Sequence, residues 1–218
     1  MYYSFSFLRG IIMNLNPLGL KHPQHIICVP ASVVAHRVNG MVDYTLNGSD
    51  LMIGQREILE DHDGFRQVLS IAAFVCNGKV WAYQRRKGIG EDRLVGKTTV
   101  AVGGHWDIKD IIHVDSVIDI DASIKVALER ELDEEVKLGA NIVSVSPMDN
   151  AICADDTPVD RKHMAIMSII EIDSESIVSK EVELEALGFF DPQELLDSDY
   201  DLETWGRVIC EQLIKMKK

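Results

Sequence analysis

The sequence predicts an α+β fold in which a mixed β-sheet lies between helices. The middle of the chain is rich in apolar, β-branched segments of strand length, and two longer segments carry apolar residues at helical spacing. Of the 218 residues, 46% are hydrophobic and 26% are charged, so the chain can bury a core of its own. Helices on both faces of a sheet would bury the apolar sides of all these elements.

Turn and helix-start signals separate the predicted elements. Asn77-Gly78 is the strongest short-range hairpin signal, so the strand that it ends should turn back into a second strand. Asp191-Pro192 predicts the start of a short helix, and residues 55–60 form another short helical patch. The predicted strands cover residues 25–34, 68–75, 79–87, 98–104 and 163–172.

Two longer helices are predicted from their apolar faces. Asp121 can cap the first helix, over about residues 122–137, and Gly139 lies just past its end. Its apolar face recurs every fourth residue, at Ile124, Leu128, Leu132 and Val136. The second helix is C-terminal and amphipathic, with apolar residues at Leu202, Trp205, Ile209, Leu213 and Met216.

The net charge of −13 limits the partners of the chain. Nucleic acid and anionic membranes would be repelled, so we expect no stable nucleic-acid binding and no membrane partner, although capped RNA ends stay open as substrates. No apolar run has the length of a membrane span. The four cysteines form no CxxC pair, so we expect reduced thiols in a cytoplasmic protein.

We divide the chain into an N-terminal extension, residues 1–63, packed on a main domain, residues 64–218. Residues 1–12 are apolar but lack a basic start and a cleavage site, so we interpret them as an extended gene prediction or a disordered tail. The sequence leaves open whether the extension forms a separate lobe or adds strands to the main sheet.

The segment LERELDEEVKL (128–138) places glutamates on consecutive turns of the first long helix. At about 100° per residue, Glu131, Glu134 and Glu135 share one face, while Val136 points toward the core. Like charges at this spacing destabilise a helix, so a divalent metal would compensate them, and carboxylates suit Mg²⁺ or Mn²⁺. The alternative is a solvated acidic face.

This segment resembles the Nudix box, G-x5-E-x7-R-E-U-x-E-E-x-G-U, where U is aliphatic. Residues 130–138 match the second half at every specified position except the glycine, which Lys137 replaces. In the first half, an insert of about twelve residues separates Gly104 from the helix, and Ala122 occupies the position of the box glutamate. Candidate substitutes for that glutamate are Asp119 and Asp121.

The stretches GFRQVLSIAAFV and YQRRKGIGEDRLVGKTTVAVGGHWD are similar to a bacterial MutT-type subgroup of Nudix hydrolases described as predicted phosphoesterases. The subgroup has Gly-Gly-His at a strand end and an insert before the Nudix helix. The similarity covers residues 64–138 well and residues 180–196 more loosely. It implies a Nudix-like α/β/α sandwich and Mg²⁺- or Mn²⁺-dependent hydrolysis of a nucleoside diphosphate linked to another group.

The resemblance implies catalytic roles for four residues of the helix. Glu134 and Glu135 would be the main metal ligands, and Glu131 would be a ligand or would orient the attacking water. Arg130 would lock Glu131 in place, or would form a simple helical ion pair with Glu134.

Two further metal ligands are implied outside the helix. In the family a backbone carbonyl before the insert binds metal, which points to Gly103 or Gly104, unless the glycine pair only serves a tight strand exit. An acidic residue often precedes a segment such as FFDPQEL (189–195), and Glu183 has the matching offset. The alternative for Glu183 and its neighbouring glutamates is a solvated surface.

Candidate substrate contacts are positive or aromatic. Arg85, Arg86 and Arg93 cluster in a chain short of positive charge and could hold phosphates, although Arg93 could equally pair with an acid.

The insert, residues 105–120, is the natural specificity loop. Its first residue, His105, could contact a phosphate, transfer a proton or simply bond to backbone. Trp106 could stack on a base, or lie in the core or a lid.

Three functions fit these residues, and a Nudix pyrophosphohydrolase is favoured because Arg130, Glu131, Glu134 and Glu135 are all kept. Lys137 and the missing box glutamate favour a binding or regulatory module without catalysis, and it stays open whether Lys137 and the insert impair turnover. A prenyl-diphosphate isomerase shares the fold but needs a cysteine facing a glutamate. The diphosphate substrate and a homodimer are also left open.

Overall fold

The computed structural model describes residues 24–34, 40–43, 46–86, 94–180 and 184–217. Three predictions therefore lie outside the described residues, namely the tail over residues 1–12, the phosphate contact of Arg93 and the metal ligand Glu183. Within the described ranges, no helix has the length and apolar character that crossing a membrane requires.

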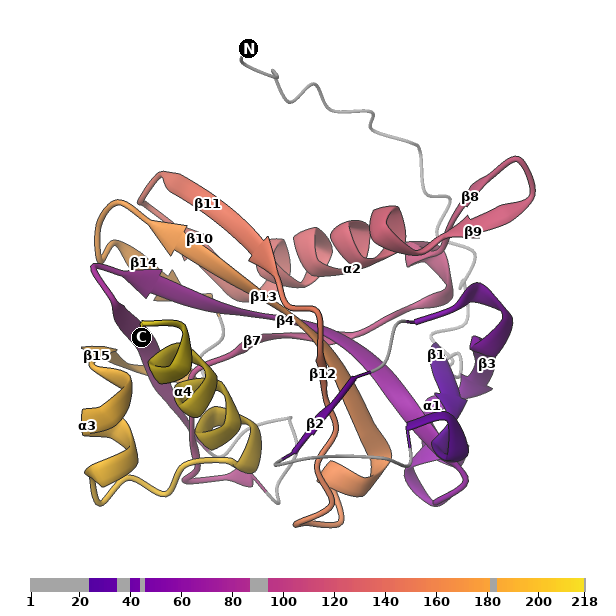
Figure 1. Cartoon of the computed structure of the whole chain (residues 1–218), viewed down its shortest axis with the longest axis horizontal. Helices are drawn as coiled ribbons and strands as arrows, with labels where there is room; N and C mark the ends of the chain where they lie inside the picture. Colours follow the sequence, from indigo (N-terminus) through magenta and orange to yellow (C-terminus); the bar gives the residue numbers. More distant parts are fainter. Residues whose placement is uncertain (1–23, 35–39, 44–45, 87–93, 181–183, 218) are drawn as a thin grey trace, which may run out of the picture.

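An 11-stranded mixed sheet forms the centre of the described chain (Figure 1). Its two longest strands, β4 (Phe65–Cys76) and β13 (His163–Ile172), run parallel with Met164 opposite Val68. Both strands are largely buried, which explains their apolar, β-branched sequences. The main path of the sheet follows the order β15 (Leu184–Phe190), β5 (Lys79–Arg85), β4, β13, β12 (Ala151–Ile152) and β2 (Met41–Val42).

Residues before β4 add strands to this sheet. β1 (His25–Pro30) pairs antiparallel with both β4 and β3 (Met52–Gln55), and β2 pairs with β12. The remaining members are β6 (Thr98–Thr99) on β5, β7 (Val102–His105) on β4, and β11 (Ile142–Pro147) on β13. Two small separate sheets pair β8 (Ile112–Val114) with β9 (Val117–Asp119), and β10 (Val136–Leu138) with β14 (Ile177–Ser179).

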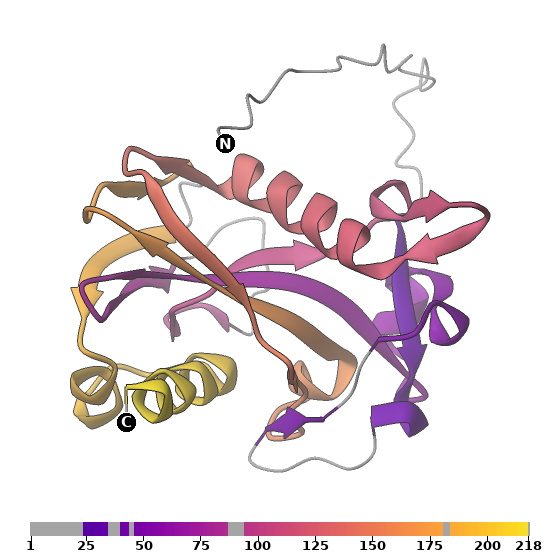
Figure 2. The same ribbon diagram turned by 45° about the horizontal axis from the view of Figure 1, so that its top comes forward.

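Helices cover both faces of the sheet, as the sequence predicted (Figures 1 and 2). On one face, Leu128 of α2 joins a core cluster with Phe74 and Val136. On the other face, Ile209 of α4 joins a second cluster with Val80. The helices are α1 (Arg56–Glu60), α2 (Ile120–Glu135), α3 (Pro192–Asp197) and α4 (Thr204–Met216). The four cysteines are reduced thiols, as predicted, and all four are buried.

Most predicted strands are present with shifted ends. The strand at 163–172 has the predicted bounds. At the predicted hairpin, Asn77 and Gly78 have φ values of 50° and 76°, the left-handed backbone that a two-residue turn requires. The strand expected over 25–34 ends at Pro30, because residues 31–34 form a short 3-10 helix instead. The segment expected as one strand over 98–104 is divided into β6 and β7.

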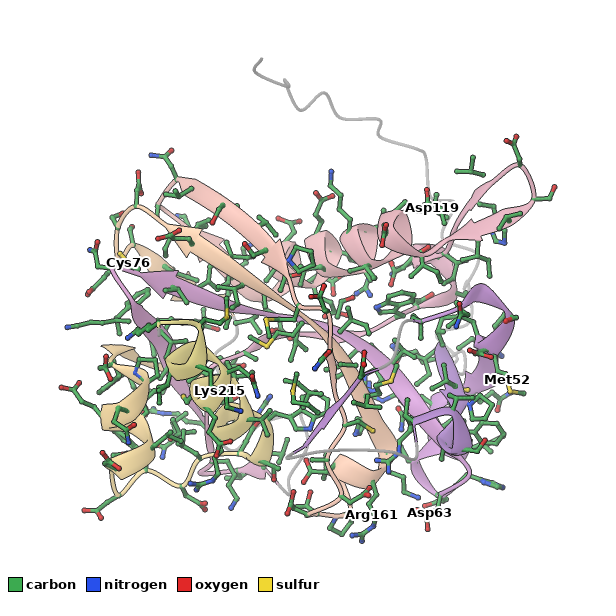
Figure 3. All side chains as sticks on the ribbon, in the orientation of Figure 1. Met52, Asp63, Cys76, Asp119, Arg161 and Lys215 are labelled. Carbon is green, nitrogen blue, oxygen red and sulfur yellow. The ribbon has the colours of Figure 1, made fainter. Side chains whose placement is uncertain are left out.

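Helix α2 begins and ends two residues earlier than predicted. Its cap is Asp119, labelled in Figure 3, whose side chain accepts a hydrogen bond from the Ala122 N–H at 3.0 Å. Asp121, the predicted cap, lies in the first turn instead. The helix ends at Glu135 because the next residues extend into β10 and pair with β14, so Gly139 does not end the helix.

The predicted helix start at Asp191-Pro192 is confirmed. The Asp191 side chain accepts a hydrogen bond from the Gln193 N–H at 2.8 Å. The hydrogen bond from Lys217, followed by that from Gln193, holds the pKa of Asp191 below its usual value. Asp191→Ala should lower the free energy of unfolding by about 1 kcal/mol at neutral pH, the typical loss for a helix cap.

This loss should shrink as the pH falls below the unfolded-state pKa of about 3.9, because a lowered folded pKa stabilises the protein only while the carboxylate is ionised. Urea denaturation at neutral and at acid pH measures both effects. The exposed Asp199→Ala is the matched control. Equal midpoints for Asp191→Ala and the unaltered chain at neutral pH would contradict the prediction.

Candidate active site

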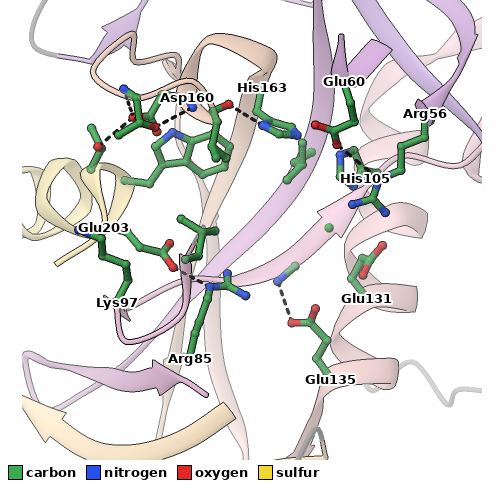
Figure 4. A pocket seen from close by; sticks show the side chains of 18 of the residues that line it. Arg56, Glu60, Arg85, Lys97, His105, Glu131, Glu135, Asp160, His163 and Glu203 are labelled. Atoms are coloured by element: carbon green, nitrogen blue, oxygen red, sulfur yellow. Dashed lines mark hydrogen bonds and ion pairs between the residues drawn. The ribbon is translucent and has the colours of Figure 1, made fainter. Parts of the chain in front are cut away.

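A cleft of about 480 Å³ opens beside the acidic face of α2 (Figure 4). One wall is formed by α2 and the end of β7, which supply the predicted residues Gly103, Gly104, His105, Arg130, Glu131, Glu134 and Glu135. The facing wall comes from the starts of β13 and α4 and the residues just before them, and includes Asp160, His163, Glu203, Thr204 and Trp205. The structure therefore brings most of the predicted catalytic residues to one concave surface.

The three glutamates of α2 differ in exposure. The side chain of Glu131 is 12% exposed, whereas that of Glu134 is 57% exposed at the rim of the cleft. Glu135 is half-buried, and its Oε2 accepts a hydrogen bond from the Gly103 N–H at 3.2 Å. Since Glu131 and Glu135 are held inside the cleft, the alternative of a freely solvated acidic face does not describe them.

Arg130 connects the helix to its surroundings. Its Nε and Nη2 donate to both carboxylate oxygens of Asp110, at 2.9 and 2.7 Å, and Nη2 also donates to the His105 carbonyl at 2.9 Å. Its Nη1 donates to Glu131 at 2.7 Å and, at a longer 3.3 Å, to Glu134. Both contacts expected of Arg130 are present, and the shorter one holds Glu131. The hydrogen bond that Arg130 donates to Asp110 is the largest cause that raises the Arg130 pKa.

Asp110 is the functional residue that sequence reasoning missed. The proposed substitutes for the box glutamate do not contact Arg130, because Asp119 caps α2 and Asp121 is exposed in its first turn. Asp110 lies in the insert, is 1% exposed, and accepts a hydrogen bond from the Asp107 N–H in a capping box over residues 107–110. Two aspartates three residues apart were the only local signal for this turn.

The insert contributes Asp110, which holds Arg130, but most of the insert does not line the cleft. After residues 108–110, the chain forms the β8–β9 hairpin, which projects beyond the N-terminal end of α2 (Figure 1). Among the described residues of the insert, His105 lines the cleft and the hairpin does not. We expected the whole of 105–120 to act as a specificity loop, but in the structure only its first residue, His105, is among the described residues that line the cleft.

The glycine pair has steric reasons for lacking side chains. Gly103 has φ +139°, and a Cβ there would lie 2.1 Å from the Ser70 carbonyl oxygen of β4. A Cβ on Gly104 would lie 2.6 Å from the carboxylate of Glu131. Gly103 thus allows close strand pairing, and Gly104 leaves the space that Glu131 occupies.

The electrostatics of the cleft favour a bound cation near Glu131. Burial raises the pKa of Glu131, and repulsion from Glu134 and Asp110 adds to this effect, while Arg130 opposes it. A carboxylate that is costly to ionise in this position would be stabilised by a nearby divalent ion.

Two predicted substrate contacts do not line the cleft. Trp106 is fully buried, and its indole N–H donates to the Ser70 hydroxyl at 2.5 Å, so no ring face is available for stacking. Arg86 lies outside the cleft lining and pairs with Glu185 on the exposed surface at 2.5 Å. Its neighbour Arg85 lines the cleft instead, where it pairs with Glu203 at 2.6 Å.

Comparisons with known proteins agree with the layered architecture. No protein-family model matches the sequence. Protein YmaB of Bacillus subtilis (strain 168) is 26% identical over 157 residues, which cover 71% of this chain and 74% of YmaB. The solved structure of Tm1382, a protein assigned to the Nudix hydrolases, gives a TM-score of 0.65 at 18% identity and covers 88% of this chain and 99% of its own.

A Nudix-family hydrolase from Clostridium perfringens covers 70% of this chain and 99% of its own, at a TM-score of 0.46 and 16% identity. The likeness to Tm1382 extends over most of this chain, and its TM-score shows a shared fold. The chain therefore has the Nudix fold.

Proposed function

We propose that the chain is a Mg²⁺- or Mn²⁺-dependent Nudix pyrophosphohydrolase that cleaves a pyrophosphate bond in a nucleoside diphosphate linked to another group. One observation carries this proposal. Glu131, Glu134 and Glu135 line a cleft of about 480 Å³ together with Arg130, which holds Glu131 at 2.7 Å. Their order in the sequence matches the second half of the Nudix box.

The residues present fit a hard divalent cation. Three carboxylates on one helical face offer oxygen ligands, and burial raises the pKa of Glu131 even with Arg130 beside it. Glu134 and Glu135 would hold the ion. When bound, it would supply positive charge that offsets the negative charge of the pyrophosphate.

The chain's own residues orient water and substrate. The side chain of Glu131 is 12% exposed and is held by Arg130, so its carboxylate can accept a proton from the attacking water in a fixed position. Arg85 and Lys97 line the cleft in an otherwise acidic chain, each paired with an acidic residue. These cations are the candidate partners for a substrate phosphate.

The two alternative functions receive less support. The cleft lining among the described residues contains no cysteine, which a prenyl-diphosphate isomerase would need. Lys137 is exposed on β10 and lies outside the described lining, so its replacement of the box glycine leaves the glutamate face intact. The missing box glutamate has a functional counterpart in Asp110, which holds Arg130.

The proposal is tested with a panel of nucleoside triphosphates, dinucleotides, ADP-sugars and coenzyme A. Release of phosphate or mononucleotide should require Mg²⁺ or Mn²⁺ and should stop when EDTA removes the ion. Glu134→Gln should lower the rate because it removes one anionic ligand and keeps the side-chain size. Tight binding of a panel compound without any turnover would instead support the non-catalytic module, and conversion of isopentenyl diphosphate would support the isomerase.

A further inference from the structure

A second group of possible metal ligands lies in the same cleft, apart from the glutamates of α2. Glu60 of α1, His105 at the end of β7 and His163 at the start of β13 each bring one ligand atom within 4.8 Å of the other two. Figure 4 shows these three residues together on one side of the cleft. All three line it, so an ion held there would face the same space as the glutamates.

The geometry of His163 prepares its ring for metal binding. Its Nδ1 lies 2.8 Å from the Val159 carbonyl oxygen. A carbonyl oxygen can only accept, so Nδ1 carries the hydrogen and the neutral ring has its lone pair on Nε2. This hydrogen bond from the second nitrogen to a carbonyl is the usual way in which proteins orient a metal-binding histidine.

His105 provides an independent indication of a ligand. Its Nε2 is buried, and no described residue forms a hydrogen bond with it. Such a buried polar nitrogen is costly unless something binds it.

We propose that Glu60, His105 and His163 form a transition-metal site for an ion of the Zn²⁺ type, separate from the glutamate face of α2. Two imidazoles and one carboxylate are the protein ligands of several zinc sites that keep an open fourth position. Bonds of this kind place neighbouring ligand atoms about 3.3 Å apart in tetrahedral geometry. The ligand atoms now lie within 4.8 Å of one another, so a bound ion would draw them closer by up to about 1.5 Å.

Arg56 of α1 is a cation beside this cluster, and its charge would oppose a bound metal ion. Its Nε lies 3.7 Å from Glu60 Oε1. Because Arg56 repels a metal ion, Arg56→Gln should strengthen Zn²⁺ binding. If Glu60 and the two histidines had only a structural role, Arg56→Gln would not strengthen Zn²⁺ binding.

The test measures Zn²⁺ binding to the full chain by competition with a chromophoric chelator. The unaltered chain should bind one Zn²⁺ that excess Mg²⁺ does not displace. His105→Ala and His163→Ala should each weaken this binding by about 100-fold or more, since loss of a mere orienting partner already costs roughly 10- to 100-fold. His113→Ala, an exposed histidine on β8, is the matched control and should bind Zn²⁺ normally.

A second measurement needs no variant. Pulsed EPR of the chain with one equivalent of Cu²⁺ should detect coupling to two imidazole nitrogens. The site does not depend on the proposed hydrolase activity, so Glu135→Gln should retain the Zn²⁺ site even where it abolishes turnover. No Zn²⁺ uptake, absence of imidazole coupling, or Zn²⁺ binding that is lost in Glu135→Gln but kept in both histidine variants would each overturn the proposal.

Discussion

Glu135→Gln is expected to lower kcat/KM by about 10²- to 10³-fold on whichever diphosphate the chain turns over, the loss typical of removing one preorganised electrostatic group. Glutamine keeps the size of the side chain and can still accept the hydrogen bond from the Gly103 N–H. The substitution therefore removes the negative charge and little else. The free energy of unfolding should change by less than about 1 kcal/mol, or should rise, because one of several crowded carboxylates becomes neutral.

The matched control lies on the same helix. Glu129 is exposed on α2, and it pairs with Lys125 at 3.8 Å rather than lining the cleft. Glu129→Gln removes an equal charge from the same helix, so it should leave kcat/KM within about twofold, as expected for an exposed pair of small energy. Equal losses in the two variants would mean that net charge, and not the position of Glu135, decides the rate.

The core elements could be predicted because their sequence patterns are local. The apolar run of β13 and the hairpin at Asn77-Gly78 each carry their own signal, and both are present in the structure. β11 was missed, because all its residues are exposed and it pairs only along one edge with β13. The boundary of α2 was also misplaced, since the pairing of β10 with the distant β14 ends the helix.

The acidic wall of the cleft could be predicted for the same reason. Arg130, Glu131 and Glu135 lie within two turns of one helix, where spacing decides which side chains share a face. The facing wall could not be predicted in this way, because His163 and Glu203 are brought to the cleft by the packing of β13 and α4 against elements far away in sequence. For Trp106 the core position, one of the alternatives left open, is the one observed, and sequence alone could not decide it because the partner of its N–H, Ser70, is distant in the chain.

Asp110→Ala is expected to lower the free energy of unfolding by about 3 kcal/mol, the lower end of the cost of removing one partner from a buried ion pair. Asp110 is 1% exposed, and both of its carboxylate oxygens accept hydrogen bonds from Arg130. In the alanine variant, the positive charge of Arg130 is balanced only by Glu131 and by Glu134 at the rim of the cleft. It also removes the acceptor for the Asp107 N–H.

The same substitution should reduce activity through Glu131. Arg130 is held in place by Asp110 and in turn holds Glu131, so loss of Asp110 should lower kcat by about tenfold or more, while KM changes little because Asp110 itself does not line the cleft. Urea denaturation and steady-state kinetics measure the two effects.

Two variants separate the charge of Asp110 from its capping role. Asp110→Asn keeps an acceptor for the Asp107 N–H and loses the charge, so it should show most of the kcat loss with a smaller loss of stability. Asp107→Ala removes the hydrogen bond to the Lys109 N–H without altering a direct partner of Arg130, and should cost about 1 kcal/mol with kcat unchanged. If Asp107→Ala lowered kcat as much as Asp110→Asn, the order of the short turn, and not the ion pair with Arg130, would position Glu131.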